Sequence, residues 1–169
     1  MIIPTTIRRY DDSLKKIILN EEYLFAFLTT DGLSHRQLWA EFLIDYDYNL
    51  VLNFSCDLPT SKEYVFKEFS ETITEKASSE IIYLLEDLLN SDYLELNEYY
   101  DFQTFQVDDI GGQQFLINFH SPTFNIHIVN GLPGEHFKSA TERKLFQFNK
   151  FLLKIVETKY QNLLGLHSV

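Results

Sequence analysis

The chain contains a single cysteine, Cys56, so no disulfide can form within its 169 residues. Secreted domains of this size often carry an even set of cysteines, and a reducing, cytoplasmic compartment is therefore expected. Cys56 closely follows the apolar run from Leu50 to Phe54. This setting predicts a small buried hydrophobic residue rather than a nucleophile.

Long apolar runs are missing as well. Charges such as Glu41 and Glu86 interrupt the longest candidates, which fall short of the roughly 18 apolar residues that a membrane helix requires. Near the N-terminus, Pro4, Arg8 and Arg9 break the continuity of a secretory signal. Because repeats and Pro/Gly/Ser-rich linkers are also lacking, we expect one domain, residues 1–169, that does not span a membrane.

Common motifs of catalysis and cofactor binding do not occur. The sequence has no P-loop, G-x-G-x-x-G, G-x-S-x-G or C-x-x-C pattern, and none of its five histidines has a partner at a metal-binding spacing. We therefore expect no cofactor, no metal and no catalytic residues. His120 and His127, on neighbouring strands of an expected hairpin, are the nearest approach to a catalytic pair.

Basic residues are scarce, with 14 Lys and Arg against 25 Asp and Glu and a net charge of −11. Residues 63–109 hold thirteen of the acids and only two bases, Lys67 and Lys76, so this segment carries the whole net charge. Such a field repels nucleic acid and anionic lipid and attracts basic proteins. Solubility alone is the alternative explanation.

Apolar and aromatic residues are plentiful, at 45% and 15%, which predicts a folded chain. Alternating or β-rich patterns separated by turn residues predict strands at 23–30, 37–45, 49–56, 64–73, 113–119 and 124–129. The segment 37–45 also resembles a helix start, because Ser34 and Gln37 have capping-box spacing. We favour the strand, since 45–48 can connect it to 49–56 as a hairpin.

Three segments have helical spacing of apolar residues: 6–18, 75–90 and a C-terminal segment from Ser139 to about Leu164. Ser139 and Glu142 form a capping box at the start of the last. The expected fold is therefore α+β: an antiparallel sheet of about five to six strands, with a mid-chain helix and a C-terminal helix packed on one face.

The hairpin 113–129 has a clear apolar face. Pairing Phe119 with Phe124 would place Ile117 opposite Ile126 and Phe115 opposite Ile128, and would leave the other face polar or nearly so. We expect the apolar set to point inward beneath the C-terminal helix: Phe115, Ile117, Phe119, Phe124, Ile126 and Ile128.

One segment combines tyrosine with carboxylate over seventeen residues, 93–109, a composition able to join aromatic anchors to charge complementarity. The alternative is that its tyrosines cap the core and its acids are only solvated. The expected partner-binding residues are Tyr93, Glu95, Glu98, Tyr99, Tyr100, Asp101, Asp108 and Asp109.

The order of elements over residues 60–164, together with the acidic charge, resembles small acidic bacterial domains of unknown function and immunity-type proteins that neutralise toxins. The resemblance includes no diagnostic motif. It implies a non-enzymatic binding protein for a basic partner such as a nuclease toxin. Two alternatives are a small enzyme with a His/carboxylate pocket between the sheet and the C-terminal helix, and a phage-type DNA mimic. The sequence leaves the oligomeric state open.

Overall fold

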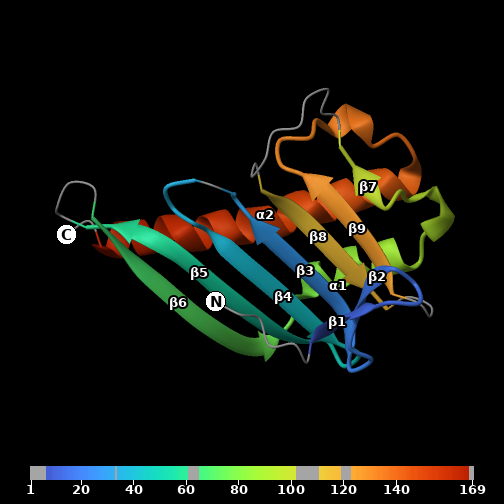
Figure 1. The fold of residues 1–169 in the computed structure, drawn as a ribbon, viewed down its shortest axis with the longest axis horizontal. Helices are drawn as coiled ribbons and strands as arrows, with labels where there is room; N and C mark the ends of the chain where they lie inside the picture. Colours follow the sequence, from blue (N-terminus) through green and yellow to red (C-terminus); the bar gives the residue numbers. More distant parts are fainter. Residues whose placement is uncertain (1–6, 33, 61–64, 102–110, 119–122, 168–169) are drawn as a thin grey trace.

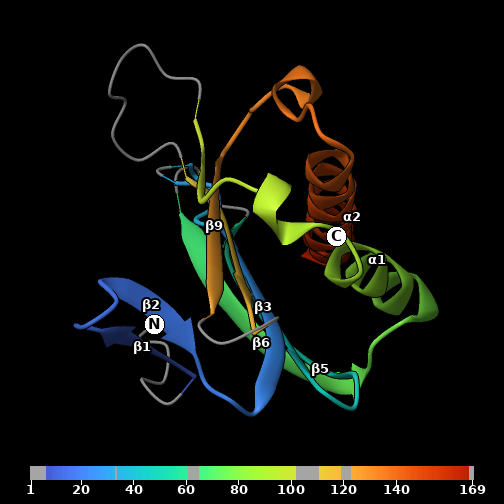
Figure 2. The ribbon, with the colours of Figure 1, turned by 90° about the vertical axis from the view of Figure 1, so that its right-hand side faces the viewer.

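The computed structural model describes residues 7–32, 34–60, 65–101, 111–118 and 123–167. These residues form a seven-stranded sheet with two α-helices on one face and a two-stranded hairpin on the other (Figures 1 and 2). The strand order is β6-β5-β4-β3-β8-β9-β7, antiparallel throughout except for the β7–β9 pair. The predicted α+β class is confirmed, with seven sheet strands in place of five or six.

The sheet consists of β3 (Tyr23–Thr30), β4 (Trp39–Asp45), β5 (Asn49–Pro59), β6 (Phe66–Lys76), β7 (Tyr99–Tyr100), β8 (Gly112–Ile117) and β9 (Phe124–Val129). The separate hairpin is β1 (Arg8–Asp11) and β2 (Lys16–Leu19). The helices are α1 (Ser79–Leu89) and α2 (Ala140–His167), with short 3₁₀ turns η1 (Tyr93–Glu95) and η2 (Gly134–His136). None of the helices in these described ranges is long and apolar enough to cross a membrane.

The ambiguous segment 37–45 is a strand, as favoured. β4 pairs with both β3 and β5, which places Phe42 on the face that α1 and α2 cover. The turn into β5 is closed by Asp45, whose carboxylate accepts hydrogen bonds from the backbone N–H groups of Asp47 at 2.9 Å and Asn49 at 2.8 Å. This Asx-type turn fixes the predicted hairpin.

The helix expected at 6–18 is wrong, because this segment forms the β1–β2 hairpin. Lys15 adopts a positive φ of 54° at the turn, while the Asp11 carboxylate accepts from the backbone N–H of Ser13 and Leu14. Leu19 then packs in a second core with sheet residues, among them Leu28 and Leu116. Burial of Leu19 against the sheet explains why a marginal helical pattern yields to a hairpin.

The β8–β9 hairpin forms, but its register differs from the prediction by two residues. Phe115 lies opposite Ile126, and Ile117 lies opposite Phe124. A shift of two keeps the same side chains on the same face, so four of the six predicted residues are buried and Phe124 is half-buried against the core. Phe119 lies outside the described residues. The opposite face is not simply polar, since the second core covers part of it.

The two helices follow their predicted positions with shifted ends. α1 begins at Ser79 rather than Glu75 because β6 continues to Lys76, and the Ser78 hydroxyl caps it by accepting from the N–H of Ile81. The predicted capping box of α2 is confirmed: Glu142 N–H donates to Ser139 Oγ at 3.0 Å, and Ser139 N–H donates to Glu142 Oε2 at 2.9 Å. The helix continues to His167, three residues beyond the expected end.

Candidate functional site

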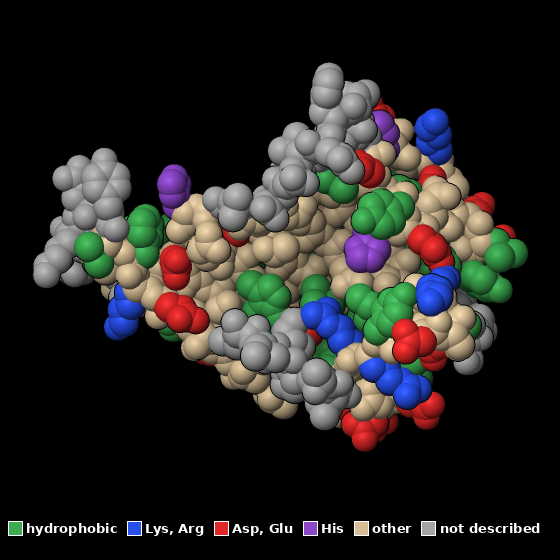
Figure 3. All heavy atoms as spheres, in the orientation of Figure 1, with side chains coloured by type: hydrophobic (Ala, Val, Ile, Leu, Met, Phe, Trp, Pro, Cys, Tyr) green, Lys and Arg blue, Asp and Glu red, His purple; other side chains and the backbone are tan. Residues whose placement is uncertain are grey.

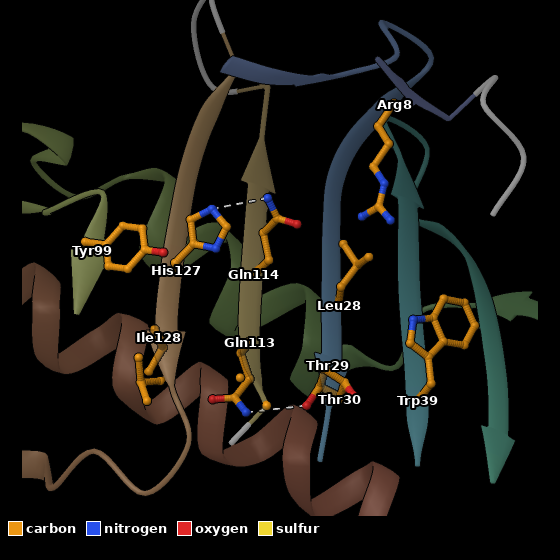
Figure 4. Close-up of a pocket in the computed structure, with 13 residues that line it drawn as sticks. Arg8, Leu28, Thr29, Thr30, Trp39, Tyr99, Gln113, Gln114, His127 and Ile128 are labelled. Atoms are coloured by element: carbon orange, nitrogen blue, oxygen red, sulfur yellow. Dashed lines mark hydrogen bonds between the residues drawn. The ribbon is translucent and has the colours of Figure 1, made fainter. Parts of the chain in front are cut away.

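The face of the sheet opposite α1 and α2, here called the open face, is only partly covered by the β1–β2 hairpin (Figure 2). In the space-filling view this face is hollowed across its middle (Figure 3). A groove of about 360 Å³ lies there, lined by residues that include Arg8, Leu28, Trp39, Tyr99, Gln114 and His127. Tyr99 and Trp39 lie at opposite ends of the groove (Figure 4). The groove therefore offers two aromatic side chains with polar groups between them.

His127 and Tyr99 form one end of the groove. β7 places Tyr99 directly beside His127 of β9, and the two rings stack with centroids 5.1 Å apart. Gln114 of β8 holds the imidazole from the other side, with its Nε2 3.4 Å from His127 Nε2 (Figure 4). Burial lowers the pKa of His127, and the charge of Glu98 only partly opposes this. The ring is therefore neutral at pH 7 and serves as a platform for the exposed Tyr99.

Gly111 and Gly112 line one end of the groove floor. Gly111 has a positive φ of 76°, and an added Cβ would lie 2.3 Å from the carbonyl oxygen of Thr30. At Gly112 an added Cβ would lie 2.7 Å from the carbonyl oxygen of Ile128. Only glycine allows the chain at the start of β8 to approach neighbouring backbone this closely.

Glu41 lies on the open face of β4, opposite Leu28 of β3 and Asn53 of β5, and is only 1% exposed. Its Oε2 accepts from Asn53 Nδ2 at 3.1 Å, whereas Oε1 has no hydrogen-bond partner in the part of the chain that the structure describes. Burial raises the pKa of this carboxyl, against the opposing effects of the Asn53 bond and of Arg8. Sequence reasoning missed this group, although its position inside an apolar strand was a usable signal.

The predicted acidic and tyrosine-rich surface is divided among several structural roles. Tyr100 is not part of a surface: it is 5% exposed, stacks on Phe137 and donates its hydroxyl hydrogen to Glu142 Oε1 at 3.1 Å. Burial raises the pKa of Tyr100 to about 12. Tyr99 and Tyr100 are adjacent in one strand and so point to opposite faces, which corrects the expectation that both bind a partner.

The other residues expected to bind a partner also have separate structural roles. Glu95 accepts from the backbone N–H of Thr141 at 3.1 Å and so helps to cap α2, and hydrogen bonds from Thr141 and Ser139 lower its pKa. Glu98 pairs with Lys16 of β2, and Tyr93 packs edge-on against Phe124. Asp101 is exposed. Asp108 and Asp109 lie outside the described residues.

The pocket expected between the sheet and α2 does not contain the expected histidine. A groove of about 550 Å³ lies between α2 and the β5–β6 side of the sheet, but no histidine is among the described residues that line it. His127 faces the opposite side of the sheet, and His120 lies outside the described residues. Within the described ranges, no three His, Cys, Asp or Glu side chains gather as a metal site would require.

Cys56 lies in the main core on the helix face of β5 and is 1% exposed. Burial raises the pKa of its thiol to about 11, so the nucleophilic thiolate is disfavoured at neutral pH. This confirms the prediction of a buried hydrophobic residue.

No family model and no curated protein matches the chain. The open-face groove and the acidic charge of the chain are the two features that bear on its function. The groove supplies an exposed ring, side-chain amides and a neutral imidazole, which are groups suited to recognition.

Proposed function

We propose that the chain is a non-enzymatic binding protein for a basic protein partner, of the immunity type that masks the positive active site of a nuclease toxin. The observation that carries this proposal is Tyr99, a tyrosine 65% exposed at the mouth of the groove. Asp101 follows two residues later and is exposed, and Glu98, which precedes Tyr99, is exposed but already paired with Lys16. An aromatic ring with carboxylates nearby is the chemistry that receives a Lys or Arg side chain.

The setting of Tyr99 favours recognition because the ring is held before any partner arrives. Stacking on His127 restricts its rotamers, so little side-chain entropy remains to be lost on binding. A cation over the ring face contributes about 0.5–1 kcal/mol at an exposed site and more when the pair is desolvated. The cation must reach the Tyr99 end of the groove, because Arg8 lines the same groove on the other side of Gln114 (Figure 4). A partner surface that shields this pair from water would bring it into the more strongly interacting range.

The acidic surface supports the same partner class through long-range attraction. Glu68, Glu75 and Glu80 are exposed and make no ion pair with any cation in the described residues, while Glu71 and Asp87 are paired with Lys159 and Lys144. The excess negative potential is therefore not cancelled locally. Such a field raises the association rate of a basic protein.

The test compares Tyr99→Ala with Tyr83→Ala, a matched control on α1 whose ring is 67% exposed. Each variant is co-expressed with the products of neighbouring genes, the captured protein is identified, and its Kd is measured by calorimetry. We expect Tyr99→Ala to weaken binding about tenfold or more, as for an interface hot spot, and Tyr83→Ala to change it less than about twofold.

Equal binding by wild type and Tyr99→Ala would exclude this site. Capture of a non-enzymatic DNA-binding protein in place of a toxin would instead favour the DNA-mimic alternative, because such a protein also recognises a negative surface.

A further inference from the structure

β6 (Phe66–Lys76) is the outermost strand on one side of the sheet and is eleven residues long. Its outer edge has no neighbouring strand within the described ranges (Figure 1). A long regular edge leaves a row of backbone N–H and C=O groups available to another strand. The groups on this edge determine which strand fits.

Backbone hydrogen bonds at the two ends of the β5–β6 ladder fix the direction of these groups. Thr60 N–H donates to the carbonyl of Val65, and Ala77 N–H donates to the carbonyl of Tyr48, at 2.9 Å in both cases. The register between them is continuous. Because hydrogen-bonded and non-hydrogen-bonded pairs alternate, odd-numbered β6 residues bond to β5 and even-numbered residues turn their backbone groups outward.

A second copy of β6 can form hydrogen bonds with these outward N–H and C=O groups. Full-length antiparallel overlap of β6 with itself places a two-fold axis at Glu71, the middle residue of the strand. Ser70 then lies opposite Thr72 of the second copy. These even-numbered residues carry the outward N–H and C=O groups, so the hydrogen-bonding pattern and the symmetry agree.

Side chains on the helix face of β6 are also self-complementary in this register. Lys67 lies opposite Glu75 of the second copy, and neither has an ion-pair partner within the described part of its own chain. Phe69 lies opposite Ile73, and both are half-buried against the core. Glu71 meets its own copy on the axis, where its ion pair with Lys159 reduces the repulsion.

An apolar groove adjoins this edge. It has a volume of about 550 Å³ and separates α2 from β6, with Ile73, Phe151, Ile155 and Leu166 in its lining. Leu166 is 74% exposed. A strand added at β6 would bring Phe69 of the second copy next to Ile73 and so toward this groove, where exposed apolar area would be covered.

We infer that a second copy of this chain docks along β6 in the register centred on Glu71, joining the two sheets in a two-fold dimer. This surface is independent of the Tyr99 groove, because β6 and β7 lie at opposite edges of the sheet.

The test measures mass by sedimentation velocity over a range of micromolar concentrations. We expect the wild type to form a species of twice its 20.0 kDa mass. Lys67→Glu or Glu75→Lys alone creates two like-charge contacts across the axis and should weaken the dimer about tenfold. The double variant Lys67→Glu/Glu75→Lys restores opposite charges at both contacts and should recover the wild-type dimer.

Ser70→Pro provides a second test, since it removes an outward N–H and leaves the bonds to β5 intact. This variant should be monomeric, with a circular dichroism spectrum that matches the wild type. A wild type that is monomeric throughout, or a charge swap that fails to restore a dimer lost in the single variants, would overturn the proposal. A monomer would leave the edge to a strand from a different protein.

Discussion

The buried carboxyl of Glu41 has the clearest consequence for stability among single residues. Burial raises its pKa, so ionisation costs more in the folded chain than in the unfolded chain. Its contribution is therefore most favourable below the unfolded pKa and is lost as pH rises through the folded pKa. We expect Glu41→Gln to raise the free energy of unfolding by about 1 kcal/mol at about pH 7, and to change it much less near pH 3.5.

Urea unfolding at the two pH values measures this difference. Glu21→Gln is the matched control, since Glu21 is exposed in the turn between β2 and β3 and should change stability by less than about 0.5 kcal/mol at either pH. An equal effect of Glu41→Gln at both pH values would show that its charge is not the cause.

Burial of individual residues could be predicted where a strand is long and not where it is short. Phe115 and Ile117 occupy alternate positions of β8 and point inward, as the predicted hairpin pairing indicated. β7 has only two residues, so no period reveals that Tyr99 is exposed and Tyr100 buried. That difference depends on β7 pairing with β9, a contact between segments distant in the chain.

Among the helices and strands, the start of α2 gives the clearest test, because a capping box of Ser139 and Glu142 holds it. Glu142 accepts hydrogen bonds from the backbone N–H groups of Lys138 and Ser139 and from the side chains of Asn97 and Tyr100. Burial opposes ionisation of Glu142, but these bonds outweigh it and hold its pKa below the usual value. The resulting stability is present above the unfolded pKa and is lost as pH falls through the folded pKa.

We therefore expect Glu142→Gln to lower the free energy of unfolding by about 1–2 kcal/mol at about pH 7, with a smaller loss in acid. Thermal or urea unfolding across this pH range measures the effect. Glu135→Gln, in the exposed η2 turn just before α2, is the control and should be nearly neutral. A loss that does not change with pH would contradict the role given to the charge.

Elements were predicted well where the capping residues and the spacing of apolar residues indicate the same boundary, as for Ser139 and Glu142 at the start of α2. The segment 6–18 failed because its sparse apolar residues fit a helix and a hairpin alike. The contacts that decide between them, such as Leu19 against Leu116, join residues almost a hundred positions apart. Such contacts cannot be read from a local window.

For the whole molecule, the sequence pattern predicted the α+β class, which is confirmed, whereas the basic partner that the charge indicates stays a prediction and the groove was not predicted at all. The groove joins Arg8, Trp39, Tyr99, Gln114 and His127, which come from five different strands. Their meeting depends on strand order, in particular on β8 pairing with β3. The acidic excess, by contrast, is a property of the sequence itself, since residues 63–109 carry the net charge of −11.

This charge predicts how a basic partner approaches. Raising salt from about 50 to about 300 mM should slow association about tenfold or more while dissociation changes little, because screening weakens long-range attraction more than close contacts. Stopped-flow mixing with the captured partner measures both rates. Glu80→Lys, an exposed change within residues 63–109, should slow association more than Glu21→Lys outside them. An association rate indifferent to salt would mean that the acidic residues serve solubility and not recognition.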